Sequence, residues 1–392
     1  MAPFLRRILV VHNAYQQRGG EDSVVEAEVA LLEGRGHEVL LYRRDNADIG
    51  PASKVALLGE IFWSRRTTHD MDSTVRDFAP DLVHVHNTFP LISPSLYWAA
   101  SRHRLPVVQT LHNFRLLCPQ AMFLRAGKVC EDCLGHLPWR GVARRCYRGS
   151  LPQSGALGGM LSMHRALGTW QHKVTRYIAL NEFCRSKFID GGLPERRIAV
   201  KPNFVDVGPP GEEARRQGGL FVGRLAPEKG LAVLLGAVDR LPDVMVDVVG
   251  TGPQEKAVAA NPRLLMHGAR SPADVLAAMR QAGYLVMPSI WYENFPRTLV
   301  EAFACGLPVI ASRLGAMAEL IEDGRTGLMF APGDADDLAQ KIAWAERHPD
   351  AMRTMGENAR REYNTKYTPE VNYQQLMAIY GQAIAEKTSG GF

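Results

Sequence analysis

The sequence predicts an α/β protein made of two doubly wound domains, and three observations lead to this. The chain has 392 residues, of which 46% are hydrophobic and 22% charged, so it is globular and large for a single core. Short β-branched runs alternate with helical stretches in both halves, as in parallel sheets built from βαβ units. A Pro/Gly-rich stretch at 207–211 interrupts this alternation. We therefore predict domains over 1–205 and 206–370, and a C-terminal helix at 371–392 that could pack back on the N-terminal domain.

Each predicted strand is a short run rich in β-branched residues. In the first half the runs are Ile8–His12, Val39–Tyr42, Leu82–His86, Val107–His112 and Tyr177–Leu180. In the second half they are Leu220–Val222, Val244–Val249, Leu264–His267, Tyr284–Met287 and Val309–Ser312. Ligands of open parallel sheets bind beyond the carboxyl ends of the strands, so the loops after these runs are the places to look for a site.

The charge and hydropathy patterns limit the class of protein. No run of about 18 apolar residues occurs, and Ile8–Val11 is too short for the apolar part of a signal peptide. We expect a cytoplasmic protein, with a peripheral position on the inner face of a bacterial cell membrane left open. Residues 1–205 carry 27 Lys and Arg against 18 Asp and Glu, a balance of +9, and the remainder has a balance of −4. The first half is therefore expected to meet an anionic membrane surface or a phosphate-bearing partner.

The most informative stretch is Glu293–Ile310. Pro296 suits the first turn of a helix and Gly306 its C-terminal end, which places Glu293 in the preceding loop and Glu301 inside the helix. Eight residues at about 100° each do not stack on one helical face. The two carboxylates are thus expected to hold hydroxyls at different parts of one ligand, while free N–H groups at the helix start face its negative part. A nucleotide sugar has this arrangement, and an ordinary solvated helix is the alternative.

The segment Leu220–Gly230 predicts a strand, a tight loop with two cations and then a helix. Arg224 can donate paired hydrogen bonds and Lys229 supplies a point charge, the partners that a buried diphosphate needs. Their place at the carboxyl end of a strand favours this role over that of surface cations. Gly252 belongs to a Gly-Thr-Gly fragment, and the full Gly-x-Gly-x-x-Gly motif of a dinucleotide oxidoreductase is not present here.

Two features of the first half could face a substrate. Gly19 and Gly20 lie between the first strand and the first helix and would let the backbone approach a phosphate, although a flexible loop would look similar. His112 follows a predicted strand and could orient a sugar hydroxyl or exchange a proton with it. A structural hydrogen bond is the alternative, and His84 and His86 compete for the same role.

In their order along the chain, these motifs resemble the retaining GT-B-fold glycosyltransferases of the group 1 family, glycosyltransferase family four. The resemblance spans nearly the whole chain and rests most specifically on the Glu293 and Glu301 pair and on the loop Gly223–Gly230. It implies a GT-B architecture of two Rossmann-like domains facing across a cleft. It also implies transfer of a sugar from a nucleotide-diphosphate sugar to a saccharide or lipid-linked acceptor in cell-surface polysaccharide biosynthesis. A same-fold epimerase or hydrolase, or a non-catalytic nucleotide-sugar-binding protein, is the alternative.

The resemblance also implies roles for single residues. Arg224 and Lys229 would hold the donor diphosphate and stabilise the leaving nucleotide. Glu301 would accept from the ribose hydroxyls, Glu293 from the transferred sugar, and His112 would lie on the acceptor side near the reacting carbon. The implied reaction is front-face transfer with retention, which needs no catalytic metal or other cofactor, and nucleic acid is not an expected partner. The implied donor-binding residues are Gly19, Gly20, Gly223, Arg224, Lys229, Gly252, Asn294, Phe295, Pro296, Arg297, Thr298 and Glu301.

Four cysteines depart from the general family pattern. Cys118, Cys130, Cys133 and Cys146 lie in a Cys/Arg-rich insertion at 114–150 with the spacing Cys-x11-Cys-x2-Cys-x12-Cys. Four thiolates could form a closed structural zinc site, and separate reduced thiols or disulfides are the alternatives. The same insertion is the candidate for recognising a glycan or a polyprenyl-diphosphate-linked acceptor.

Two further patterns have structural interpretations. Asp334 and Asp336 have the spacing of a metal-binding Asp-x-Asp motif, but they open a predicted helix after Pro-Gly and are interpreted as a helix cap. The stretches 55–66 and 157–170 have apolar faces flanked by basic or aromatic residues. They could lie on a membrane, but core helices are favoured.

Overall fold

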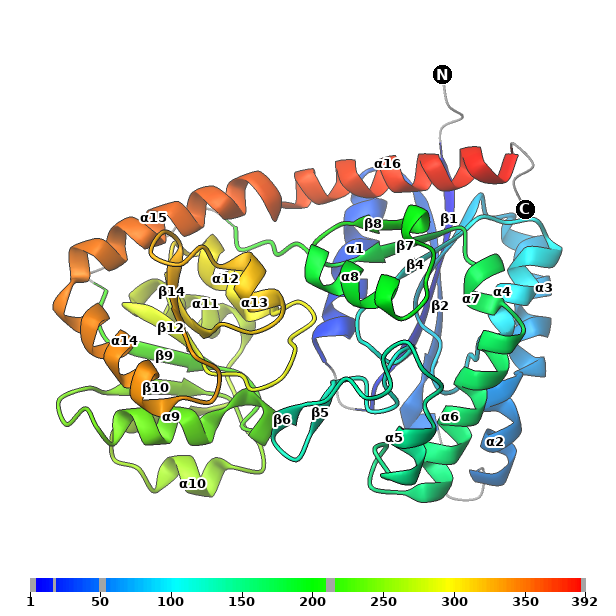
Figure 1. Cartoon of the computed structure of the whole chain (residues 1–392). Coiled ribbons are helices and arrows are strands. Elements are labelled where there is room, and N and C mark those ends of the chain that lie inside the picture. Colours follow the sequence, from blue (N-terminus) through cyan, green and yellow to red (C-terminus); the bar gives the residue numbers. More distant parts are fainter. Residues whose placement is uncertain (1–4, 17–18, 49–53, 209–215, 389–392) are drawn as a thin grey trace. The chain divides into compact units, whose positions relative to one another are not determined.

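The chain folds into two compact units in a computed structural model that describes residues 5–16, 19–48, 54–208 and 216–388 (Figure 1). Unit 1 comprises residues 1–121, 131–202 and 372–392, and unit 2 comprises residues 122–130 and 203–371. The chain thus leaves unit 1 after Pro202, whereas the sequence placed this boundary after residue 205. Residues 209–211 of the expected break lie outside the described residues.

Unit 1 is built on a parallel six-stranded sheet with the order β2-β1-β3-β4-β7-β8 in its described part. Ile8, Leu9, Val10 and Val11 of β1 are each at most 1% exposed, as expected for a strand covered on both faces. The strands are β1 (Arg7–Ala14), β2 (Glu38–Asp45), β3 (Leu82–Asn87), β4 (Val107–Thr110), β7 (Arg176–Ala179) and β8 (Ile198–Val200). The helices of unit 1 before residue 203 are α1 (Gly20–Gly34), α2 (Lys54–Phe62), α3 (Arg65–Phe78), α4 (Ser95–Arg102), α5 (Trp139–Ala143), α6 (Leu151–Ala166), α7 (Thr169–His172) and α8 (Glu182–Asp190).

The last helix of the chain, α16 (Pro369–Thr388), packs on unit 1 from residue 372 onward. Leu376, Ile379 and Tyr380 share a hydrophobic cluster with Ile8 of β1 and Leu82 of β3. Figure 1 shows this helix in red at the C-terminal end of the chain. The segment that completes the core of unit 1 therefore follows unit 2 in the sequence.

Unit 2 is built on a second parallel six-stranded sheet with the order β11-β10-β9-β12-β13-β14. Leu234 of α9 and Phe303 of α12 are fully buried in its hydrophobic clusters. The strands are β9 (Gly219–Val222), β10 (Val246–Val249), β11 (Leu264–Gly268), β12 (Tyr284–Met287), β13 (Val309–Ser312) and β14 (Gly327–Phe330). The helices are α9 (Leu231–Val238), α10 (Glu255–Ala259), α11 (Pro272–Gln281), α12 (Arg297–Ala304), α13 (Ala316–Leu320), α14 (Ala335–Arg347) and α15 (Pro349–Lys366).

The predicted α/β fold of two parallel-sheet domains is confirmed, and each predicted strand occurs with small shifts of its ends. The strands β8 and β14 were not predicted. A short antiparallel hairpin, β5 (Leu124–Arg125) and β6 (Lys128–Val129), belongs to unit 2 and not with the rest of the insertion at 114–150.

Each of the two stretches that could have lain on a membrane is divided between two helices, 55–66 between α2 and α3 and 157–170 between α6 and α7. The stretch 157–170 is not one helix, because α6 ends at Ala166 and Gly168, with φ +64°, separates it from α7. Leu157 and Leu161 are 1% and 3% exposed, which confirms a core role for this face of α6. Every helix in the described part of the chain is too short or too polar to cross a bilayer.

Two helical glycines give a matched test of helix packing. We expect Gly356→Ala in α15 to lower the free energy of unfolding by about 1–3 kcal/mol, because its Cβ would overlap the carbonyl oxygen of Gly306. Gly381→Ala in α16 meets open space and should raise the stability by roughly 0.5–1 kcal/mol through the better helix propensity of alanine. Thermal unfolding followed by circular dichroism measures both changes, and equal midpoints in the two variants would contradict the packing described for α15.

Candidate functional site

In unit 2, three loops gather beyond the carboxyl ends of the neighbouring strands β10, β9 and β12. They are the segments 223–230, 250–254 and 288–296. The backbone N–H of Leu225 donates to the carbonyl of Thr251 at 2.8 Å, and that of Ile290 donates to the carbonyl of Glu228 at 3.0 Å. The three loops are therefore joined directly to one another.

Glycines allow this close approach. Gly230 has φ +72°, and a Cβ on it would overlap the carbonyl oxygen of Pro288. Gly250 has φ +140°, and a Cβ there would overlap the carbonyl oxygen of Gly223. Larger residues would be strained by the backbone angle and excluded by the overlap. Gly252 likewise packs against the backbone of Leu225, so this predicted donor residue shapes the loops.

The two segments singled out from the sequence meet at Lys229 and Glu293. The Lys229 ammonium donates to Glu293 Oε1 at 2.7 Å, although 64 residues separate them in the chain. The same oxygen accepts from Ser289 Oγ at 2.8 Å and from Trp291 Nε1 at 3.0 Å. The Glu293 side chain is 7% exposed, against 25% for Lys229. The arrangement presents a fixed cation at the edge of a buried carboxylate.

Arg224 and the start of α12 complete this set of residues. Arg224 forms an ion pair with Glu228, and its side chain is 63% exposed. On α12, Arg297 Nε donates to Glu301 Oε1 at 2.9 Å across one helical turn. The helix begins directly after Pro296; the N–H of Leu299 donates to the carbonyl of Pro296 at 3.0 Å, whereas those of Arg297 and Thr298 have no helical carbonyl before them. In the loop before this helix, Asn294 is 8% exposed, and the ring of Phe295 packs edge-on against the ring of Tyr367.

The other predicted substrate-facing residues, Gly19, Gly20 and His112, belong to unit 1. Gly20 is the first residue of α1, and the N–H of Gly19 donates to Asp22 Oδ2 at 2.7 Å. His12, at the end of β1, lies with Nε2 2.8 Å from Asp22 Oδ1. A carboxylate of the chain itself thus occupies this helix start, where the sequence alone suggested a phosphate contact.

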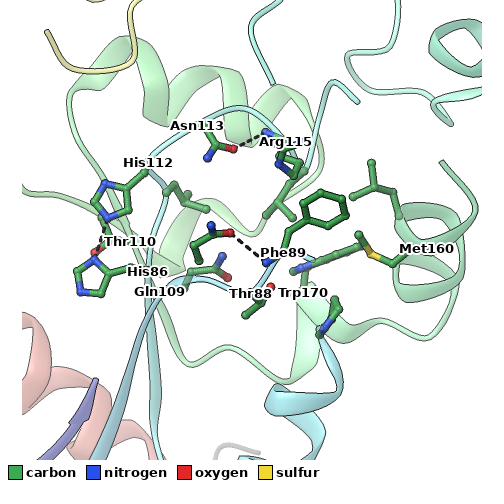
Figure 2. A pocket seen from close by; sticks show the side chains of 15 residues that line it. His86, Thr88, Phe89, Gln109, Thr110, His112, Asn113, Arg115, Met160 and Trp170 are labelled. Carbon is green, nitrogen blue, oxygen red and sulfur yellow. Dashed lines mark hydrogen bonds between the residues drawn. The ribbon is translucent and has the colours of Figure 1, made fainter. Parts of the chain in front are cut away.

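His112 lies two residues beyond β4 and lines a pocket of unit 1 (Figure 2). In that view His86 and His112 stand at one end, and Phe89, Met160 and Trp170 stand at the other. The Arg115 guanidinium lies over the Phe89 ring, 4.9 Å from its centre. The pocket therefore combines a polar end with an apolar wall. Its full lining is His86–Phe89, Pro94, Gln109–Asn113, Arg115, Leu116, Met160, Leu161 and Trp170.

The histidines of this pocket belong to one buried network. His86 Nδ1 and His112 Nε2 are 2.8 Å apart, and their rings stack with centres separated by 5.1 Å. Burial, reinforced by His84, lowers the pKa of His86 to about 3. Burial and the neighbouring His86 hold the pKa of His112 well below its ordinary value. Both imidazoles are therefore neutral at physiological pH.

Behind the pocket, Glu28, His84 and His86 bring three ligand atoms within 4.8 Å of one another, the arrangement of a potential metal site. However, the Lys201 ammonium lies 3.2 Å from Glu28 Oε2, and the Tyr380 hydroxyl lies 2.6 Å from His84 Nδ1. A metal ion here would be repelled by the buried ammonium. We therefore interpret the cluster as an ion-pair and hydrogen-bond network.

A carboxylate that the sequence did not single out lies beside this pocket. Glu21 Oε2 accepts from the Tyr15 hydroxyl at 2.9 Å and lies 3.4 Å from Asn113 Nδ2. Burial raises the pKa of Glu21 to about 7, although the hydrogen bond from Tyr15 and the charge of Arg115 oppose this shift. An acid in the first turn of a helix is commonplace, and only the fold brings it to Asn113.

Among the described residues, only Glu28, His84 and His86 bring three potential ligand atoms within 4.8 Å of one another. The thiols of the four cysteines are not gathered this closely. Cys118 and Cys133 are 8% exposed, and Cys130 and Cys146 are half-buried. The structural zinc site stays a prediction. The helix-cap interpretation of Asp334 is confirmed, because its Oδ1 accepts from the N–H groups of Asp336 at 2.9 Å and Asp337 at 3.0 Å.

Two family profiles match the chain one after the other. The profile described as Glycosyltransferase Family 4 matches residues 18–208, and the profile described as Glycosyl transferases group 1 matches residues 212–362. Phosphatidyl-myo-inositol mannosyltransferase of Mycobacterium leprae is 31% identical over 230 residues, which are 55% of this chain and 61% of the relative. An uncharacterized glycosyltransferase of Methanocaldococcus jannaschii is 32% identical over 206 residues, 50% of this chain and 58% of the relative. The chain therefore matches about six-tenths of the length of these relatives.

Solved structures share the fold over nearly the whole chain. Sucrose-phosphate synthase from Thermosynechococcus elongatus aligns with a TM-score of 0.71 at 19% identity, over 97% of this chain and 99% of that one. The Anabaena protein HepE, in complex with UDP-glucose, aligns with a TM-score of 0.65 at 18% identity, over 95% of this chain and 99% of that one. These likenesses show the fold, which is GT-B, two Rossmann-like domains.

The raised pKa of Glu21 predicts a pH-dependent stability. Since a carboxyl group has an ordinary pKa near 4.5 when unfolded and about 7 here, the folded chain loses stability as pH rises from 4.5 to 7. Glu21→Gln removes this loss, so the variant should gain stability relative to the wild type across that window and hold the gain above it. Urea unfolding at pH 5 and pH 8 measures the difference, with Glu33→Gln on the exposed face of α1 as the control. A gain that is equal at both values of pH would refute the shift.

Proposed function

Because the chain belongs to the group 1, family 4-type glycosyltransferases, we propose that it moves a hexose from a nucleotide-diphosphate sugar to a saccharide or lipid-linked acceptor with retention of configuration. The observation that carries the proposal is the 2.7 Å contact of Lys229 with Glu293, which unites the cation loop and the carboxylate segment in one site. The Anabaena neighbour, solved with UDP-glucose, supports a donor of this class.

Different residues of unit 2 would bind different parts of the donor. Lys229 and Arg224 would neutralise the diphosphate and stabilise the charge that grows on it as the sugar leaves. The free N–H groups at the start of α12 would add hydrogen bonds to the same negative part. Glu301, whose side chain is 19% exposed, would accept from the ribose hydroxyls, and Glu293 from the hydroxyls of the transferred sugar.

Two cations at the diphosphate also support a reaction without a catalytic metal, because they supply the positive charge that a divalent ion would otherwise provide. In the front-face route that we propose, the bond between the anomeric carbon and the phosphate oxygen breaks as the acceptor oxygen approaches from the same side. The acceptor proton passes to the leaving phosphate. Holding that phosphate in place is then the main catalytic task of the chain.

The donor loop gives a direct test. We expect Arg224→Ala and Lys229→Ala each to lower kcat/KM for transfer by about a hundredfold or more, because each removes a charge-assisted contact to the leaving group. Arg325→Ala, which removes an exposed cation paired with Glu322 in the same unit, is the control. Donor turnover with and without acceptor is measured for all three. Wild-type transfer by both loop variants would end the donor-site assignment, and donor turnover that needs no acceptor would indicate a hydrolase.

The pocket of unit 1 supports an acceptor with both a polar and an apolar part. Its histidine end offers hydrogen-bond acceptors to hydroxyls, and Arg115 offers a guanidinium to a phosphate. The wall of Phe89, Met160 and Trp170 offers apolar contact. We propose that a sugar or lipid-linked sugar of a cell-surface polysaccharide pathway binds here.

A basic and aromatic face of unit 1 supports binding at an anionic membrane surface. Trp139 on α5 is 62% exposed and Leu137 before it is 53% exposed. The Arg140 guanidinium lies 5.6 Å from the centre of the Trp139 ring, and Arg145 and Arg148 are exposed after α5. Exposed apolar groups beside arginines suit the boundary between lipid head groups and acyl chains.

Vesicle binding tests this face. Since each arginine near an anionic surface contributes about 1 kcal/mol, the triple variant Arg140→Gln, Arg145→Gln, Arg148→Gln should bind vesicles that contain phosphatidylglycerol roughly a hundredfold more weakly than the wild type. The triple variant Arg325→Gln, Arg347→Gln, Arg353→Gln, which removes three exposed charges from unit 2, is the matched control. Co-sedimentation measures the affinity. Failure of the wild type to bind these vesicles would refute the membrane surface and leave the transfer reaction untouched.

A further inference from the structure

A buried ion pair lies behind the pocket of unit 1. Glu28 of α1 is 2% exposed and Lys201, the residue after β8, is 1% exposed, with 3.2 Å between Oε2 and Nζ. Lys201 also donates to Asn372 Oδ1 at 3.0 Å. Burial alone would raise the pKa of Glu28, but Lys201 and His84 outweigh it and hold the pKa well below its ordinary value. Glu28 is therefore a carboxylate that cannot donate.

The other oxygen of this carboxylate faces two histidines of β3. Glu28 Oε1 lies 2.9 Å from His84 Nδ1 and 3.4 Å from His86 Nε2. His84 and His86 are two residues apart on one strand, so both side chains point to the same face of the sheet. Through His86, the carboxylate is connected to His112, which lines the pocket.

The positions of the protons follow from this chain of contacts. A neutral imidazole carries one proton, and a lone pair on His86 Nε2 would face the lone pairs of Glu28, so the proton of His86 belongs on Nε2. His86 Nδ1 must then accept, and its partner 2.8 Å away, His112 Nε2, must donate. Because His112 is neutral as well, its Nδ1 keeps a lone pair.

We propose that Glu28, fixed by Lys201, acts through His86 as a positioning residue that locks His112 in the Nε2–H tautomer and gives its Nδ1 to the substrate as a hydrogen-bond acceptor. An unprotonated Nδ1 can accept a hydrogen bond from a sugar hydroxyl in the pocket. The inference rests on the proposed transfer reaction for the identity of the substrate, whereas the tautomer is a property of unit 1 by itself.

The Glu28→Gln variant tests the direction of hydrogen-bond donation from His112 to His86 and from His86 to Glu28. Lys201 can only donate, so the amide oxygen of the new glutamine turns to Lys201 and its NH2 turns to His86. His86 must then accept at Nε2 and donate from Nδ1, and His112 becomes the Nδ1–H tautomer. Nitrogen NMR of the ring-labelled full chain reads the tautomer directly. We expect the wild type to show an unprotonated Nδ1 in His112 and Glu28→Gln to show a protonated one.

Two further variants separate positioning from a structural effect. Tyr380→Phe removes the hydroxyl 2.6 Å from His84 Nδ1 but lies off the path to His112, so it should leave the His112 tautomer unchanged. His86→Phe keeps a ring of similar volume without nitrogens and should leave His112 with mixed tautomers. It carries the test if Glu28→Gln does not fold.

With donor and acceptor present, Glu28→Gln should lower kcat by about tenfold, the effect of one lost hydrogen bond, with the KM for the donor unchanged. A protonated Nδ1 in wild-type His112, or an unprotonated one in Glu28→Gln, would overturn the proposal. If the wild type transfers no sugar at all, the proposed reaction fails while the NMR result still decides the tautomer.

Discussion

Both groups of candidate site residues depend on one constraint: parallel strands carry their carboxyl ends, and the loops that follow them, to the same edge of a sheet. In unit 2 the central strands β10, β9 and β12 deliver three loops to one place. In unit 1 the neighbours β1, β3 and β4 do the same, and the side chain of Asn13 in β1 accepts from the N–H of Leu91 in the loop after β3 at 2.8 Å. The topology of the sheet thereby brings together residues that are far apart in the sequence.

Within unit 2 the charges at this edge are paired with one another. Lys229 and Arg224 each pair with a carboxylate, and Glu293 accepts from three donors through one oxygen. A carboxylate held at three points has little freedom left to lose when it meets a ligand. The loops that carry these residues are also fixed by glycine contacts such as Gly230 against Pro288. Close glycine contacts and paired charges together fix the geometry of these loops without a ligand.

Sequence reasoning identified ten of the twelve strands described in the two six-stranded sheets, the loop with Arg224 and Lys229, and the helix with Glu301, because these depend on local patterns and on spacing within one segment. It missed β8, which has three residues, and with it the partner of Glu28 that the strand delivers. Glu28 and Lys201 are 173 residues apart, and neither has a local pattern that differs from an ordinary helical or surface residue. The place of the hairpin at 122–130 was also missed, since membership of a unit is decided by contacts and not by chain order.

The buried ion pair of Glu28 and Lys201 has an electrostatic role in unit 1 that goes beyond any contribution to stability. Buried ion pairs are often no more stable than apolar residues of the same volume, so stability is a weak reason to keep one. A lone carboxylate beside His86 would draw a proton onto that ring and charge the wall of the pocket. The Lys201 ammonium cancels that field, so Glu28 can orient the His86 ring while His86 and His112 stay neutral. Asn372 of α16 holds Lys201 in place, and through this contact the last helix of the chain takes part in a site that it does not line.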